Sequence, residues 1–203
     1  MSTQVETRIQ VDLEGRNRTT AFFRLILAIP AAIFASSFGS YVGDNGENFI
    51  SGLTYSAGLL VLPVILAVAA RGVYPSYALT LNHALVELNT RVSAYVLLLN
   101  DRYPTIEGNE SVAVIFPDVE GGRKLNRGLV LVKWLLAIPL YLVGVVYSLY
   151  ALVLAILGWV TVVSTGSMPA SSAEGIVRVL QYWNRVVGYA LALVTDEYPS
   201  FSL

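Results

Sequence analysis

The chain has 203 residues, of which 55% are hydrophobic and only 13% are charged, whereas a typical soluble domain carries about 25% charged residues. This composition predicts an integral membrane protein that forms one compact unit. The net charge of −1 excludes a polybasic nucleic-acid binder, and the absence of cysteine excludes disulfides, thiolate metal sites and a cysteine nucleophile.

The N-terminal part of the chain begins with a strand pattern and continues with two apolar runs. Charged and apolar residues alternate from Val5 to Leu13, which predicts a half-exposed strand. The apolar runs extend from Thr20 to Ser37 and from Leu53 to Ala70, with a Gly- and Asn-rich loop between them. Each run is close to the length that crosses a hydrocarbon core of about 30 Å. The first half therefore predicts a hairpin of two membrane spans.

A longer apolar run extends from Leu129 to Ser164 and contains one charged residue, Lys133. As one straight helix it would measure about 54 Å, which exceeds the thickness of a bilayer. We therefore predict two spans joined by a tight turn near Val146 to Ser148. The predicted fold class is an all-α integral membrane protein with four transmembrane helices in two hairpins.

Two other stretches, Ser76 to Asn100 and Ala173 to Thr195, are apolar but interrupted by charged residues. Their uninterrupted apolar parts are too short to span a membrane. Apolar residues in the second stretch recur at helical spacing, which predicts an amphipathic helix on the membrane surface or folded against the spans. We expect one face of this helix to contact a partner protein or the membrane surface, with an aromatic anchor. The face consists of Ile176, Leu180, Trp183 and Val187.

An internal repeat organises the chain. The segment from Asn17 to Pro30 aligns without gaps to the segment from Asn126 to Pro139, and six of the fourteen positions are identical. The closing segments, Asp101-Arg-Tyr-Pro104 and Asp196-Glu-Tyr-Pro199, also match. We therefore predict two repeated units.

The two units are residues 1–108 and residues 109–203, each with a lead-in strand, two transmembrane helices and a cytoplasmic amphipathic helix. We expect the strands at 5–13 and 112–116 to pair. Two spans in each unit would give both copies the same orientation, related by an axis along the membrane normal. All 13 Lys and Arg residues then lie on one side, and the positive-inside rule places both termini in the cytoplasm.

Three sequence features carry a resemblance to a known family. They are the repeated Leu-Ala-Ile-Pro, the segment Asn184-Arg-Val-Val-Gly-Tyr189, and the closing Asp196-Glu-Tyr-Pro-Ser-Phe-Ser-Leu203. The chain resembles the bacterial membrane family known as domain of unknown function 4389, and the resemblance is strongest in residues 123–203. It implies two tandem copies of that domain and a location in the bacterial cytoplasmic (inner) membrane. It implies no established activity.

Arg24 and Lys133 occupy equivalent positions about one turn inside the first span of each unit. Because cations inside a membrane are costly and often functional, these two are candidates for contact with lipid headgroups or another anion. The alternative is that both long side chains extend to the membrane interface and have no further role.

The sequence contains no Walker loop, no G-x-S-x-G and no H-E-x-x-H motif. We expect a non-enzymatic membrane subunit or scaffold, with no cofactor and no metal or catalytic residues, that packs against membrane lipids and other membrane proteins or itself. One alternative is a small transporter or lipid-binding membrane protein, which the repeat and the in-span prolines Pro30 and Pro139 favour. A third interpretation is an enzyme that acts on lipid headgroups through Asp101 and Asp196.

Overall fold

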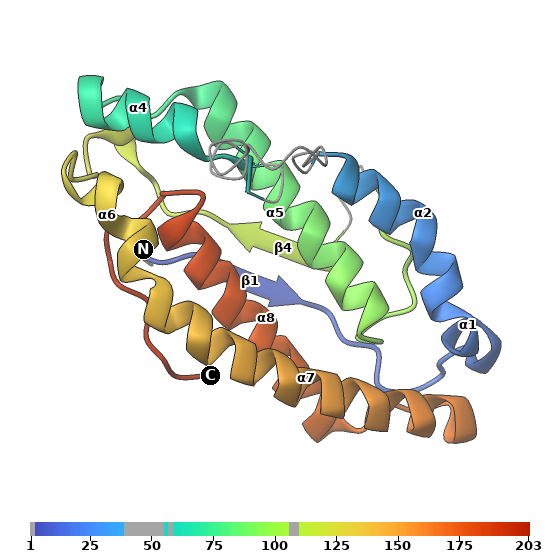
Figure 1. Ribbon diagram of the computed structural model, residues 1–203. Helices are drawn as coiled ribbons and strands as arrows, with labels where there is room; N and C mark the ends of the chain where they lie inside the picture. Colours follow the sequence, from blue (N-terminus) through green and yellow to red (C-terminus); the bar gives the residue numbers. More distant parts are fainter. Residues whose placement is uncertain (1–2, 39–54, 57–58, 106–109) are drawn as a thin grey trace, which may run out of the picture.

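The computed structural model describes residues 3–38, 55–56, 59–105 and 110–203. This part of the chain is mostly helical, with two small antiparallel sheets (Figure 1). The elements in chain order are β1 (Glu6–Ile9), α1 (Arg18–Phe22), α2 (Arg24–Ser37), β2 (Tyr55–Ser56), β3 (Leu59–Leu60), α4 (Val61–Arg71), α5 (Ser76–Val96), β4 (Val112–Ile115), the 3₁₀ turn η1 (Glu120–Gly122), α6 (Leu129–Leu136), α7 (Ile138–Thr165) and α8 (Ala170–Ala190).

Helix α7 shows that the predicted turn near Val146 to Ser148 is wrong. The helix continues without a break for 28 residues from Ile138 to Thr165. Neither glycine nor proline occupies the three residues where the turn was expected, so no local signal ends the helix there. The break in this run lies at Ala137 instead, and α7 begins there with Pro139 in its first turn, where a proline is well tolerated.

The prediction of four transmembrane helices is therefore wrong. Helices α2 and α4 contain 14 and 11 residues, short of the roughly 20 that a span requires. Among the described residues, one helical run, Leu129–Thr165, is long and apolar enough to cross a membrane, and only 17% of its most apolar window is buried. The loop expected at 39–48 lies outside the described residues. Counting spans therefore supports neither the two hairpins nor the orientation derived from them.

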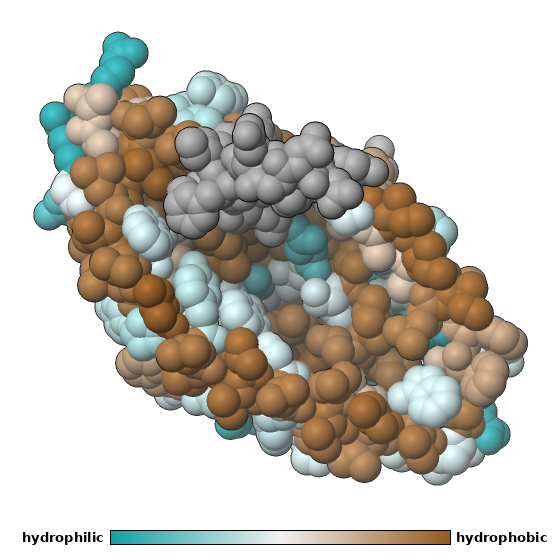
Figure 2. All heavy atoms as spheres, in the orientation of Figure 1, coloured by the Kyte–Doolittle hydropathy of each residue, from teal (hydrophilic) through white to brown (hydrophobic). Residues whose placement is uncertain are grey.

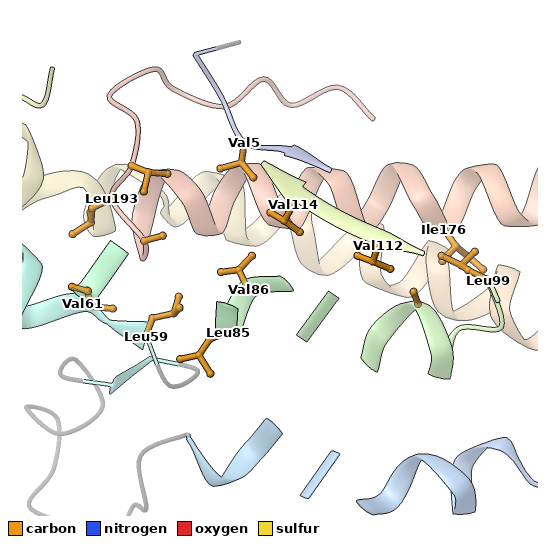
Figure 3. Packing of buried hydrophobic residues seen from close by; sticks show 14 of the residues in the cluster. Val5, Leu59, Val61, Leu85, Val86, Leu99, Val112, Val114, Ile176 and Leu193 are labelled. Atoms are coloured by element: carbon orange, nitrogen blue, oxygen red, sulfur yellow. The ribbon is translucent and has the colours of Figure 1, made fainter. Parts of the chain in front are cut away.

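The expected pairing of the two lead-in strands is confirmed for four residues of each. Strand β1 runs antiparallel to β4, with Glu6 opposite Ile115 and Ile9 opposite Val112. Val112 and Val114 are buried on one face of β4, whereas the residues between and after them are exposed. Figure 3 shows these valines in the core beside Val86 of α5, with α8 alongside.

Helix α7 buries only a narrow stripe of its surface, and this stripe packs mainly on α8. The buried residues are Leu140, Gly144, Ala151, Ala155, Gly158 and Val162. Glycines in this interface allow the close approach of the two helices. A Cβ at Gly144 would lie 2.6 Å from the ring of Trp183, and one at Gly175 would lie 2.4 Å from Leu154.

Helix α8 is folded against other elements of the chain and does not lie alone on a membrane surface. Ile176, Tyr182 and Val186 are completely buried, and the helix contacts α7, α5 and β1. The sequence leaves open whether this amphipathic helix lies on the membrane surface or folds against the other helices, and the structure has the second placement. Its apolar face is part of the core.

The continuity of α7 can be tested by placing proline at Val146. This residue is 62% exposed, so a substitution there changes backbone hydrogen bonding more than packing. In a continuous helix Val146→Pro should cost about 3 kcal/mol of stability, because it removes a helical hydrogen bond and clashes with the preceding turn. Thermal unfolding in detergent, followed by circular dichroism, measures the effect against Val146→Ala. Equal melting temperatures for the two variants would show that a turn lies there.

Candidate functional site

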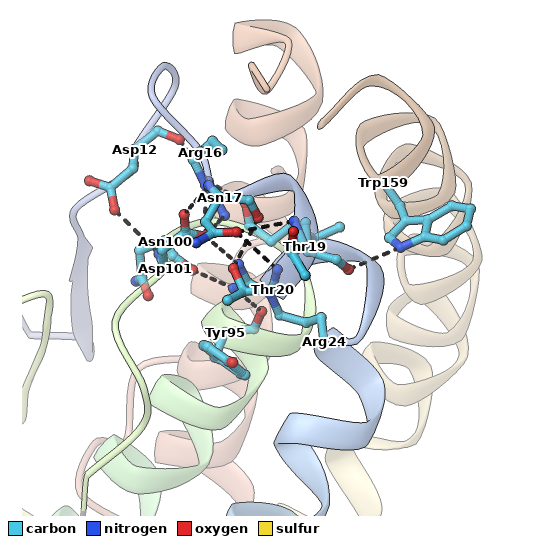
Figure 4. Close-up of polar contacts among 12 residues, drawn as sticks. Asp12, Arg16, Asn17, Thr19, Thr20, Arg24, Tyr95, Asn100, Asp101 and Trp159 are labelled. Atoms are coloured by element: carbon cyan, nitrogen blue, oxygen red, sulfur yellow. Dashed lines mark hydrogen bonds and ion pairs between the residues drawn. The ribbon is translucent and has the colours of Figure 1, made fainter. Parts of the chain in front are cut away.

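The most unusual polar feature of the fold is a buried cationic side chain that belongs to an apolar helix and contacts an aspartate. This feature occurs twice. In the first cluster Arg24, at the start of α2, is 2% exposed. Its Nη2 contacts the carboxylate of Asp101, and its Nη1 donates hydrogen bonds to the carbonyl oxygens of Asn100 (2.6 Å) and Tyr95 (3.1 Å). The guanidinium also lies 4.3 Å from the centre of the Tyr95 ring. Figure 4 shows these side chains converging between α2 and the end of α5.

A second arginine joins the first cluster. Arg16 donates from Nε to Oδ1 of Asp101 at 2.9 Å, and its Nη1 donates to the carbonyl oxygens of Asp12 and Leu98. Asp101 also accepts a hydrogen bond from the backbone N–H of Asn17 at 3.0 Å. One carboxylate therefore connects the segment before α1, the start of α2 and the segment that follows α5 (Figure 4).

Local backbone geometry brings these groups together. Leu98 has a φ of 63°, in the left-handed region, where the chain leaves α5 and turns toward Asp101. At the other end Asn17 caps α1, and its side-chain oxygen accepts from the backbone N–H groups of Thr19 and Thr20 at 3.1 Å each. The cap leaves the Asn17 N–H free to donate to Asp101.

The second cluster repeats this arrangement with a lysine. Lys133 is completely buried, and its Nζ lies 2.7 Å from Oδ1 of Asp196 and 2.6 Å from the carbonyl oxygen of Thr195. The ring of Tyr189 lies 5.4 Å from Nζ. Oδ2 of Asp196 accepts the backbone N–H of Asn126 at 2.6 Å, and Asn126 caps the residues that lead into α6.

The contacts of the two clusters fall on positions that match in the repeat. The matching pairs are Asn17 with Asn126, Arg24 with Lys133, Tyr95 with Tyr189, and Asp101 with Asp196. Arg16 has no counterpart, because the gap-free alignment places Leu125 at its position. In the first cluster two guanidinium groups therefore contact one carboxylate. In the second cluster one ammonium group contacts one carboxylate.

The two halves of the chain also hold each other's helices. Arg18 donates from Nε to the carbonyl oxygen of Val163 at 2.7 Å, near the end of α7. The matching Arg127 donates from Nη2 to the carbonyl oxygen of Arg71 at 3.5 Å, at the end of α4. Helix α1 packs on α7, and α6 packs on α4. The division into units at 1–108 and 109–203 stays a prediction, and these contacts show that the two halves pack against each other.

The sequence placed Arg24 and Lys133 as cations that contact an anion or extend to an interface. The structure places both in the interior, where the anion that each contacts is an aspartate of the same chain. Sequence reasoning missed these aspartates as partners, although the repeated Asp-x-Tyr-Pro ending marked both positions. The carboxylates proposed for catalysis are occupied by these contacts. Within the described part of the chain no group of three or more metal-ligating side chains occurs.

The predicted contact face of α8 is only partly accessible. Ile176 is buried in the core, whereas Leu180, Trp183 and Val187 are half-buried and line a cavity of about 220 Å³ between α5 and α8. The Nε1 of Trp183 donates to Oγ of Ser148 at 3.0 Å. Trp183 therefore anchors α8 to α7 within this chain.

Comparison with known protein families gives a match for the second half of the chain. Residues 127–202 match the family model described as Domain of unknown function (DUF4389). The matched segment contains α6, α7, α8 and the Lys133–Asp196 cluster, so the expected resemblance is confirmed for one copy. No curated protein and no solved structure matches the chain.

The second cluster can be tested with a double-mutant cycle. Lys133→Met leaves the carboxylate of Asp196 without its cation, and breaking a buried pair in this way costs about 3 kcal/mol or more. Replacing both residues, with Lys133→Met and Asp196→Leu, should recover most of that loss, because no unpaired charge remains. Denaturant unfolding in detergent measures both. The exposed pair between Lys124 and Glu120 is the control, and Lys124→Met should change stability little. Additive effects of the two core substitutions would contradict the pairing.

The first cluster predicts a dependence of stability on acid pH. Burial by itself would raise the pKa of Asp101, but hydrogen bonds from the Asn17 N–H and from Arg16 and Arg24 hold this pKa below its ordinary value of 3.8. The ionised carboxylate therefore stabilises the fold above about pH 3.8, and this contribution is lost as the pH falls through the lower folded-state pKa. The unfolding free energies of the wild type and of Asp101→Asn should differ at pH 6 and lie closer together at pH 3. A constant difference at both pH values would argue against an ionised Asp101.

Proposed function

We propose that this chain is a non-enzymatic membrane subunit or scaffold whose α2 and α6–α7 surfaces contact lipid and the helices of partner membrane proteins. The observation that carries the proposal is the exposed surface of α6–α7. This run has a mean hydropathy of 2.4 in its most apolar window, and only 17% of that window is buried inside the chain.

Large apolar side chains are exposed along most of the length of these helices. On α7 the more exposed members are Leu142, Val145, Val146, Leu149, Leu152, Val153, Ile156, Leu157 and Val160, and on α2 they are Leu25, Ile26, Ile29 and Ile33. Figure 2 shows this apolar surface along α6, α7 and α2. Soluble monomers rarely expose continuous apolar patches larger than a few hundred Å². The surface therefore favours contact with lipid or with other membrane proteins.

The alternative explanations for a long apolar helix fit this chain less well. The core helix of a soluble protein is mostly buried, whereas α7 buries one narrow stripe. A signal sequence lies near the N-terminus, whereas this helix begins beyond residue 128. The self-contained charge pairs of Arg24 and Lys133 favour a structural role for these groups over a reactive one.

Finer parts of the proposal stay predictions. They are the bacterial inner membrane as the location, cytoplasmic termini, a second copy of the DUF4389 domain in residues 1–108, and the identity of the partner subunits. Membrane lipids and other membrane proteins are the expected partners, and nucleic acid is not. A cavity between α2, the end of α5 and α7 favours lipid binding as a second function.

Membrane association can be tested by fractionating cells that express the whole chain. The wild type should stay in the membrane fraction after alkaline carbonate washing. The double variant Leu142→Asp, Leu149→Asp places charges on two side chains that are 68% and 61% exposed, so it should shift most of the protein out of that fraction without unfolding it. Tyr77→Asp, on the exposed side of α5, is the control and should leave the distribution unchanged. Wild-type chain in the soluble fraction would contradict the proposal.

A further inference from the structure

A cavity of about 410 Å³ lies where the two repeats meet. One wall comes from Arg24 and Leu25 at the start of α2, and the end of α5 forms a second. The opposite wall comes from α7 in the second repeat, where Leu152, Ala155 and Trp159 line it. We call this cavity the inter-repeat groove. It is distinct from the smaller cavity beside Trp183.

The groove is apolar apart from one side chain. Among the described residues that line it, Arg24 is the only charged one. Among the described lining residues, Trp159 carries the other side-chain N–H group. Its Nε1 already donates to the carbonyl oxygen of Ala21 at 3.1 Å (Figure 4). Arg24 is 98% buried, and its Nε has no hydrogen-bond partner among the described residues, whereas both of its Nη atoms have partners. This Nε is covered by protein atoms, so Arg24 closes the inner side of the groove and does not offer its Nε to a molecule bound there.

The rim of the groove continues into the apolar surface of α2 and α7. Leu25, Leu152 and Ile156 line the groove and are also 71%, 54% and 53% exposed. Figure 2 shows the surface hollowed between the arms formed by α7 and α2, with apolar side chains on both. A molecule in contact with the outer apolar surface can therefore pass sideways into the groove without crossing a polar barrier.

We propose that the inter-repeat groove binds one acyl chain of a bilayer phospholipid. A groove lined almost entirely by apolar side chains and open to the outer apolar surface matches the chemistry of such a chain. The volume lies in the lower range for small-molecule sites. This inference rests on the membrane location proposed above.

The size of the groove argues against a protein segment as its occupant. An α-helix is about 10 Å across with side chains, so a single turn would fill roughly 400 Å³. A partner helix or a second copy of this chain could therefore place no more than about one turn inside. A flexible acyl chain can fill a cavity of this volume.

The test measures lipid that stays bound to the full chain. The protein is purified in mild detergent from membranes that contain phosphatidylglycerol and phosphatidylethanolamine, washed with further detergent, and examined by native mass spectrometry. The wild type should retain about one phospholipid per chain. Leu152→Trp places a bulky ring in the groove and should reduce the retained lipid at least fivefold. Leu149→Trp is the control on the same helix, because Leu149 is similarly exposed but does not line the groove, and it should retain lipid as the wild type does.

A second variant keeps the test decisive if Leu152→Trp fails to fold. Ala155→Leu fills the inner wall of the groove with a smaller group and should also reduce retained lipid. Equal retention by the wild type and a folded groove variant would overturn the proposal, as would a wild type that retains no phospholipid or retains a second protein chain in its place. If the wild type is found in membranes but carries no lipid, this inference fails alone. If it is not found in membranes, the proposed function fails as well.

Discussion

A buried cation can stay in an apolar interior only if an anion lies beside it, and this requirement shapes both halves of the chain. Removing Arg24 or Lys133 from water is costly, and the cost is offset only by a nearby carboxylate with additional hydrogen bonds. Asp101 and Asp196 supply that carboxylate from the segments that follow α5 and α8. These segments must therefore return to the start of α2 and α6. The left-handed residues Leu98 and Leu193 lie in the turns that bring them back.

The paired clusters also explain why the halves interlock. Each aspartate holds the N–H of an asparagine that caps the first helix of its repeat, so the position of that helix is set from two directions. Arg18 and Arg127 lie next to these asparagines and reach the helix ends of the opposite repeat. The pairing of β1 with β4 adds another contact between the two halves. The apolar stripe of α7 is covered by α8 from its own half and by α1 from the other. The outer faces of α2 and α7 stay uncovered, and this surface is what supports a membrane location.

Part of this arrangement could be predicted from the sequence. The gap-free alignment paired Arg24 with Lys133, the alternating pattern placed the first strand, and the repeat placed the strand that pairs with it. The partner of each cation was missed because Asp101 lies 77 residues beyond Arg24, and no local pattern links them. The turn expected near Val146 was wrong because the length of the run was judged against a bilayer that it would cross at right angles. Nothing in the fold limits the length of this helix to the thickness of a bilayer. Its own backbone hydrogen bonds favour an unbroken helix through Val146.

Composition and periodicity determined that the chain has more apolar surface than its own core can bury, and that its two halves are built from a repeated pattern. Only the tertiary structure decided which of that surface is internal. The face of α8 with Ile176 and the outer face of α7 with Leu149 are both apolar in the sequence, yet one is buried and the other exposed. Apolar spacing shows that a face avoids water, but it does not distinguish lipid from the side chains of another helix. That choice depends on the glycines of the α7–α8 interface and on the two distant charge pairs, whose contacts exist only after the chain has folded.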